Sequence, residues 1–163
     1  PSLRQGGTGS RSEDDRQPET LPDKYESGNH NAPGLSGLAA SLEWLKARGI
    51  GSVRRHELAL TERLLAGFER IGHPVRVYGP GNLDERVGVV SISLDGFDPQ
   101  DLAAILDESF DIQVRAGLHC APGAHKAIGT FEQGGTVRFS LGPFSTEEHV
   151  EAALSAIREI AGA

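Results

Sequence analysis

The sequence predicts an α+β domain in which helices cover an antiparallel sheet. Apolar residues recur with a helical or strand period over most of the chain, although they make up only 37% of its 163 residues. The expected elements follow in the order helix, helix, strand, strand, helix, strand, loop, strand, helix. This order lacks the regular strand–helix alternation that is typical of a parallel sheet. The length suffices for one compact domain with a sizeable core.

Residues 1–34 differ in composition from the rest of the chain. They are rich in Gly, Pro, Asp, Glu and Ser and show no helical or strand period. Loops of this length are uncommon inside compact domains and are usually functional or disordered. We therefore expect an extended loop over residues 1–34, held by something outside the chain, and an α+β domain over residues 35–163.

Two helices are expected first. Arg48-Gly49 ends the first helix, and Gly72 follows the second. The apolar face of the first consists of Leu35, Leu38, Leu42 and Leu45. That of the second consists of Leu60, Leu64, Phe68 and Ile71. A short strand over 75–78 then leads through a turn-rich segment to the strongest strand candidate, 87–94.

The second half of the domain is expected to open with a helix after Asp98-Pro99, because a capping carboxylate precedes a proline at the first helical position. Its buried face is Leu102, Ile105, Leu106 and Phe110. Strands over 112–116 and 136–141 flank an irregular segment, 117–135. A capping-box pattern predicts that the last helix begins at Ser145, with Glu148 three residues later. Its apolar face consists of Val150, Leu154 and Ile157.

Charge and cysteine content narrow the class of protein. The net charge is −7 and no basic block is present, which argues against nucleic acid or an anionic membrane as a partner. No apolar stretch approaches the roughly 18 residues that span a bilayer, and no signal peptide is visible. One cysteine forms no internal disulfide, so the sequence predicts a cytoplasmic protein.

That cysteine, Cys120, lies in the segment of greatest chemical interest. The preceding strand is expected to end near residue 116, so Cys120 falls in a loop where side chains can face a cleft. Arg115 and His119 could favour the thiolate, the nucleophilic form. A free cysteine is more often a small buried hydrophobe, but the surrounding Gly, Ala and Pro favour exposure. Cys120 with His119 and His125 offers too few well-spaced ligands for a metal.

At these residues a family resemblance becomes specific. The segment Arg115-Ala116-Gly117-Leu118-His119-Cys120-Ala121 resembles the R-x-G-x-H-C-A motif of group II cysteine desulfurases, in the class V aminotransferase superfamily. Three further segments resemble family motifs in the same order: Gly6–Ser10, Glu26–Gly34, and Thr136–Ser140 followed by Phe144–Glu148. The resemblance covers essentially the whole chain. It implies the small C-terminal domain of a fold-type I pyridoxal-phosphate transferase.

The resemblance also implies roles for single residues. Cys120 corresponds to the nucleophile that takes sulfur from substrate cysteine, leaving alanine and an enzyme persulfide. Arg138 corresponds to the arginine that binds the substrate's α-carboxylate through paired hydrogen bonds. Arg115 and His119 are further candidates for this substrate pocket, with bracing of the cysteine loop as the alternative role for Arg115. Gly7 and Thr8 correspond to a loop that reaches the phosphate of the partner subunit's pyridoxal 5'-phosphate, which implies a homodimer.

The sequence departs from the family in its lysines. The enzyme needs a lysine that holds the cofactor covalently, and the chain has only Lys24, Lys46 and Lys126. Lys126 follows the cysteine, whereas the family's cofactor lysine precedes the glycine–threonine loop. We therefore expect the chain to begin near the end of the large domain, to lack the cofactor lysine, and to be inactive by itself.

Three functions are compatible with these observations. The first is the C-terminal portion of a cysteine desulfurase, acting on a small amino acid and passing sulfur to an acceptor protein. The second is a selenocysteine lyase or a related class V lyase. The third is a non-catalytic dimerisation or interaction domain, which the missing lysine would favour.

Overall fold

The computed structural model describes residues 5–9, 11 and 13–162, so the expectation for Ser10 lies outside the described residues. The chain forms two compact units that divide after Arg48. The division follows helix α1 (Ala32–Arg48), whereas composition placed a boundary at residue 34. Helix α1 buries none of its residues, and it groups with the loop rather than with the core. The assignment of residues 1–34 to the end of a large domain stays a prediction.

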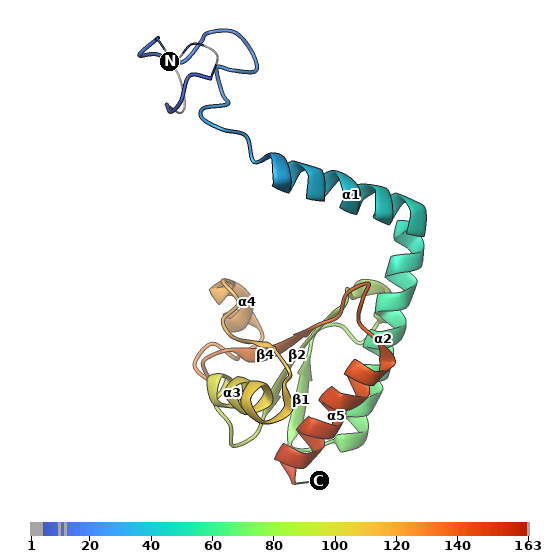
Figure 1. Ribbon diagram of the computed structural model, residues 1–163. Coiled ribbons are helices and arrows are strands. Elements are labelled where there is room, and N and C mark those ends of the chain that lie inside the picture. The colour runs from blue at the N-terminus through green and yellow to red at the C-terminus, as the bar shows by residue number, and fades with distance from the viewer. Residues whose placement is uncertain (1–4, 10, 12, 163) are drawn as a thin grey trace. The chain divides into compact units, whose positions relative to one another are not determined.

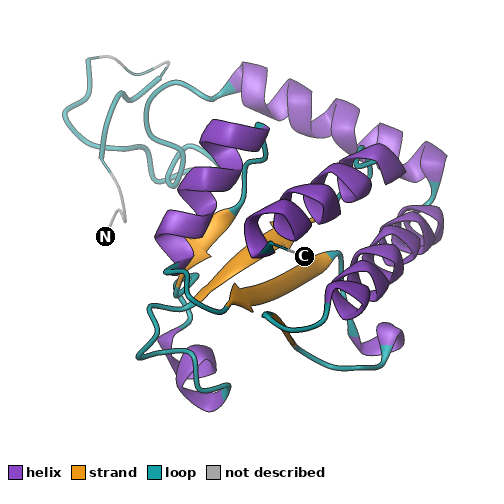
Figure 2. Cartoon of the chain, turned by 90° about the horizontal axis from the view of Figure 1, so that it is seen from below, coloured by secondary structure: helices purple, strands orange, loops and turns teal. Residues whose placement is uncertain are grey.

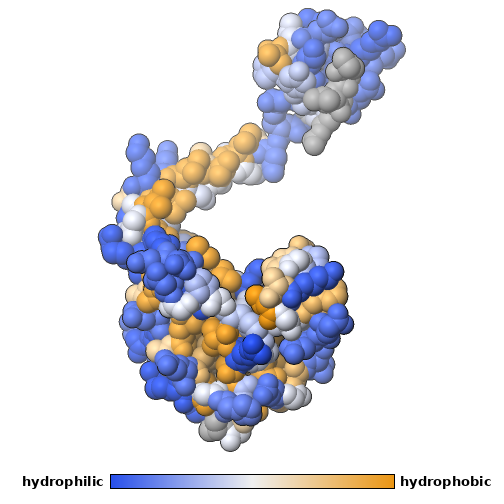
Figure 3. All heavy atoms as spheres, turned by 180° about the vertical axis from the view of Figure 1, so that it is seen from behind, coloured by the Kyte–Doolittle hydropathy of each residue, from blue (hydrophilic) through white to orange (hydrophobic). Residues whose placement is uncertain are grey.

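The first unit holds the loop and α1. The amide of Gly28 donates to the carbonyl of Gly7 at 2.8 Å, which closes the loop on itself. The Asn31 side chain accepts from the Gly34 amide at 3.1 Å, within the first turn of α1. Three leucines on α1 are exposed, and apolar surface follows this helix in Figure 3. They are Leu35, Leu38 and Leu42.

The second unit is a four-stranded antiparallel sheet with helices, which confirms the predicted α+β class. The strands, in the order β1-β2-β4-β3, are β1 (Val75–Tyr78), β2 (Val89–Leu94), β4 (Thr136–Ser140) and β3 (Arg115–Gly117). The helices are α2 (Ile50–Ile71), η1 (Leu83–Glu85), α3 (Pro99–Phe110), α4 (Pro122–Ala127) and α5 (Glu147–Ala161). Helices α2, α3 and α5 cover one face of the sheet, and α4 stands apart from them (Figures 1 and 2).

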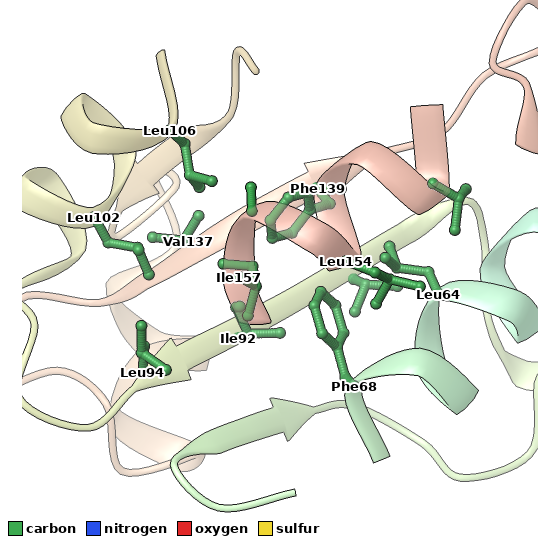
Figure 4. Packing of buried hydrophobic residues seen from close by; sticks show 14 of the residues in the cluster. Leu64, Phe68, Ile92, Leu94, Leu102, Leu106, Val137, Phe139, Leu154 and Ile157 are labelled. Atoms are coloured by element: carbon green, nitrogen blue, oxygen red, sulfur yellow. The ribbon is translucent and has the colours of Figure 1, made fainter. Parts of the chain in front are cut away.

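The hydrophobic core lies between these three helices and the sheet (Figure 4). Strand β2 alternates between buried Val90, Ile92 and Leu94 and less buried residues, as a sheet with one covered face requires. Full burial of one such aliphatic side chain contributes about 1.5–3 kcal/mol. Helices α2 and α5 approach closely at Gly67, where an added Cβ would overlap the side chain of Leu154.

Several element boundaries differ from the sequence-based expectations, including the end of β4 at Ser140 rather than at residue 141. The second strand begins at Val89 rather than at residue 87. Strand β3 covers 115–117 rather than 112–116, because residues 112 and 114 pack against the core without forming ladder pairs. Helix α5 is capped by Thr146 and not by Ser145: the Thr146 side chain accepts from the His149 amide, and the His149 ring accepts from the Thr146 amide at 3.2 Å.

Candidate active site

The sheet face opposite the core carries a row of polar side chains. Tyr78 pairs with Ser91, Ser91 with Arg138, and Arg138 with Arg115, so the row crosses all four strands. Directly paired residues project to the same face of a sheet. Arg138 lies between buried Val137 and Phe139, which point to the core, so the row faces away from it. The register therefore brings together two arginines that lie far apart in sequence.

Cys120 lies in the turn that joins β3 to α4. The Ala121 amide donates to the Leu118 carbonyl at 2.8 Å and closes this turn. The Cys120 side chain is exposed, and Nη2 of Arg115 donates to its sulfur at 3.1 Å. A cationic donor at this distance stabilises a thiolate more than a neutral thiol. The prediction of an exposed cysteine beyond a strand end is therefore confirmed.

His119 is half-buried, and its Nδ1 is fully buried. Its Nε2 lies 3.0 Å from the hydroxyl oxygen of Thr136, and its ring centre is 5.3 Å from that of His125. His125 is buried and its Nδ1 lies 2.7 Å from the Thr130 hydroxyl. Burial lowers the pKa of His119 below its usual value, and the nearby positive charge of Arg138 lowers it further. His119 is therefore neutral at physiological pH.

Arg138 is half-buried on β4, next to Arg115 in the ladder. Its Nε is fully buried and has no hydrogen-bond partner among the described residues. Buried donors are nearly always paired in folded proteins, so an unpaired guanidinium N–H points to a ligand that completes it. A carboxylate is the ligand that this planar donor set suits best.

A close backbone approach supports the cysteine turn. Gly135 has φ 104°, and an added Cβ would overlap the carbonyl group of Gly117 across the β3–β4 pair. Neither backbone can shift without disturbing the ladder that carries Arg115 and Arg138. The backbone just before the cysteine turn is therefore held at a fixed distance from the backbone just before β4.

Replacing Gly135 by Ala is expected to destabilise the fold by at least about 2 kcal/mol, because a left-handed backbone strain adds to the overlap with Gly117. Urea unfolding measures this change. Gly142→Ala is the matched control, since an added Cβ at Gly142 meets no atom within 4 Å. Equal stability of the two variants would contradict the proposed close approach.

A family model described as aminotransferase class-V matches residues 1–153. The chain belongs to the class-V aminotransferase family. A probable cysteine desulfurase from Methanothermobacter thermautotrophicus is 37% identical over 157 residues, which cover 93% of this chain and 37% of that protein. One from Pyrococcus abyssi is 36% identical over 139 residues, which cover 85% of this chain and 33% of that protein.

A solved structure agrees with the sequence relatives. The apo cysteine desulfurase of Thermococcus onnurineus superposes with a TM-score of 0.77 at 37% identity, over 86% of this chain and 34% of that one. The chain thus spans about a third of the length of these class-V relatives.

Other predicted site residues of this class-V chain lie in different surroundings. Thr8 lies in the first unit, where its hydroxyl donates to the Arg11 carbonyl at 2.6 Å. Gly7 accepts from the Gly28 amide in the same loop. The ammonium of Lys126 lies 4.8 Å from the centre of the Phe131 ring. In the described part of the chain, no three or more His, Cys, Asp or Glu side chains are grouped to hold a metal ion.

Sequence reasoning missed Thr136 and the His125–Thr130 pair. Thr136 begins β4 two residues before Arg138, and a period of two places both side chains on the same face. That alternation could have identified Thr136 as a neighbour of the cysteine loop. The pair formed by His125 and Thr130 depends on α4, a helix that the sequence reading left as an irregular segment.

Within the described residues, no helix has the length and apolarity needed to cross a bilayer.

Proposed function

We propose that this chain is the C-terminal part of a pyridoxal-phosphate-dependent cysteine desulfurase, with Cys120 as the residue that accepts sulfur. The observation that carries the proposal is an exposed thiol held 3.1 Å from the guanidinium of Arg115. Arg115 belongs, with Arg138, to the row of polar side chains on the sheet. The relatives named above as probable cysteine desulfurases support the same reaction.

The sulfur transfer balances with one thiolate and one substrate molecule. The Cys120 thiolate attacks the sulfur of L-cysteine, so an S–S bond forms and the substrate's Cβ–S bond breaks. The electron pair of the broken bond stays on Cβ, which takes up the proton of the substrate's thiol and becomes the methyl group of alanine, so the terminal sulfur of the persulfide carries the negative charge. Arg115 stabilises the negative charge, first on the attacking thiolate and then on the terminal sulfur of the persulfide.

Arg138 would bind and orient the substrate. Its unpaired Nε–H and the terminal nitrogens offer two parallel donors to an α-carboxylate. Binding that end of the amino acid fixes where its sulfur lies relative to Cys120, and such orientation accounts for a large part of many enzymatic rate enhancements.

The residues of this chain that would hold the cofactor belong to the loop of Gly7 and Thr8. The donor set fits a phosphate, because backbone amides of small residues and a hydroxyl can approach its oxygens closely. Thr8 would exchange its bond to the Arg11 carbonyl for a phosphate oxygen. When bound, pyridoxal phosphate supplies the electron sink that labilises the bonds of the substrate amino acid.

The proposal extends to the whole protein. It includes a cytoplasmic homodimer in which the loop of one subunit contacts the cofactor phosphate of the other, and an acceptor protein that removes the persulfide sulfur. The lysine that bears the cofactor would come from outside these 163 residues, since Lys126 lies against Phe131 and follows the cysteine.

Peptide mass spectrometry tests the sulfur acceptor directly. The intact protein that contains this chain is incubated with pyridoxal phosphate and L-cysteine, then digested without reductant. We expect the peptide carrying Cys120 to gain the mass of one sulfur atom, and a reductant to remove it. L-Alanine in place of L-cysteine is the control. Consumption of L-cysteine with sulfur on another residue, or on none, would contradict the proposal.

A further inference from the structure

We propose that His119 is a positioning residue for the nucleophile: its hydrogen bond to Thr136 and its contact with His125 hold the turn in the conformation that directs the Cys120 thiol to Arg115. The inference deepens the proposed function and rests on it for its catalytic meaning. Its structural part concerns only the conformation of the turn.

The turn adopts a backbone conformation that its residues disfavour. His119 has φ 53° and Cys120 has φ 59°, both in the left-handed region. Side chains with a Cβ rarely occupy this region, and two in succession are rarer because each carries a steric cost. Such strain persists only where the surroundings hold it. The sulfur position therefore depends on a restraint outside the turn's own backbone.

The imidazole of His119 provides that restraint. It is fixed to the sheet by Thr136, which is fully buried at the start of β4. It also lies against the ring of His125 on α4, which is itself held by the Thr130 hydroxyl. Strand β4 and helix α4 therefore both hold the side chain of the residue that immediately precedes the cysteine.

The protonation state of His119 follows from its neighbours. The charged or titratable groups that affect it are Arg138 on β4, Arg115 on β3 and His125 on α4. Together with burial, they favour the neutral ring and lower its pKa. We assign the ring hydrogen to Nε2, which donates to Thr136, because the buried Nδ1 has no partner in the described residues and an unpaired acceptor costs less than an unpaired N–H.

The pKa of His119 in the folded protein lies below its unfolded value of about 6.5, so the unfolded state takes up the proton first as pH falls. The contribution of His119 is thus fully present above about pH 6.5 and is lost on acidification through the range below it.

The contacts of the two ring nitrogens favour a positioning role for His119 over direct catalysis or substrate binding. Nε2 is engaged by Thr136 and Nδ1 is buried. With the ring hydrogen on Nε2, Nδ1 has no hydrogen to donate to a carboxylate, and Nε2 already donates to Thr136. The sequence-based suggestion that His119 binds substrate is replaced in this proposal by an indirect role through Cys120.

The test measures how fast iodoacetamide alkylates Cys120 in the intact protein as a function of pH, followed on the Cys120 peptide. His119→Ala should slow alkylation at neutral pH by about tenfold, the equivalent of about one net hydrogen bond. His119→Gln, which keeps an N–H donor for Thr136, should restore the rate to within about threefold. Thr136→Val should act in the direction of His119→Ala.

His73→Ala is the matched control, because His73 is exposed and paired with Asp95 away from the turn. A His119→Ala profile that superposes on that of the unaltered protein would overturn the proposal. So would a loss of turnover with unchanged alkylation, since His119 would then act on the substrate. Alkylation needs neither cofactor nor substrate, so its result stands even if the persulfide experiment finds a different sulfur acceptor.

Discussion

Cys120→Ser is expected to lower alanine formation from L-cysteine by at least about 10³-fold in the intact protein, because a hydroxyl at this position cannot hold a persulfide and is a far weaker nucleophile. The side chain is exposed, so the free energy of unfolding should change by no more than about 0.5 kcal/mol. Alanine release measures the first quantity, and urea unfolding measures the second.

Ser140→Ala provides a control for Cys120→Ser. Ser140 is also exposed on the second unit, at the opposite end of β4 from Thr136. Turnover of this variant should stay within about twofold of the unaltered protein. Sustained alanine formation by Cys120→Ser would remove the central role of the thiol, whatever the behaviour of the control.

Arg138→Gln is expected to weaken substrate binding strongly. Loss of a charge-assisted pair with the substrate carboxylate should raise KM about 10- to 100-fold, with a smaller fall in kcat. The KM of Arg138→Lys should lie between those of the unaltered protein and Arg138→Gln, because an ammonium offers no planar pair of donors. Steady-state kinetics with L-cysteine measure both constants. Unfolding measurements should show little loss of stability, since the buried Nε has no partner in the described residues to lose.

Arg76→Gln is the control that separates loss of the Arg138 contact with substrate from loss of a positive charge in general. Arg76 is an exposed arginine on β1 whose guanidinium lies 5.3 Å from the centre of the Tyr78 ring. Its replacement removes one positive charge from the sheet face and should change KM by no more than about twofold. An Arg138→Gln effect no larger than this would eliminate Arg138 as the carboxylate ligand.

Elements with strong local signals could be predicted from the sequence. Strand β1 has the predicted bounds, and Asp98 accepts from the Gln100 amide at the start of α3, as its sequence pattern indicated. Helix α4 could not be predicted, because its six residues include one proline and one glycine and offer no apolar period. The shift of β3 depends on core packing of residues 112 and 114, which lies beyond local sequence.

The candidate site could be predicted in part. Exposure of the Cys120 side chain could be predicted from the small residues around it and is confirmed. The pairing of Arg115 with Arg138 could not be predicted, because only the strand register sets residues 23 positions apart side by side. The orientation of His119 also required the structure: sequence places it next to the thiol, whereas its ring is bound to Thr136.

The neighbouring Arg115 and Arg138 have an electrostatic consequence for the approach of small molecules. The chain carries a net charge of −7, yet this ladder pair concentrates two guanidinium groups on one patch. The net negative charge disfavours the approach of anions, whereas this patch attracts them and raises their local concentration beside the thiol. Added salt shortens the reach of that attraction to about 8 Å at physiological ionic strength. Capture of an anionic group would thus be steered to the one place where the cysteine can react with it.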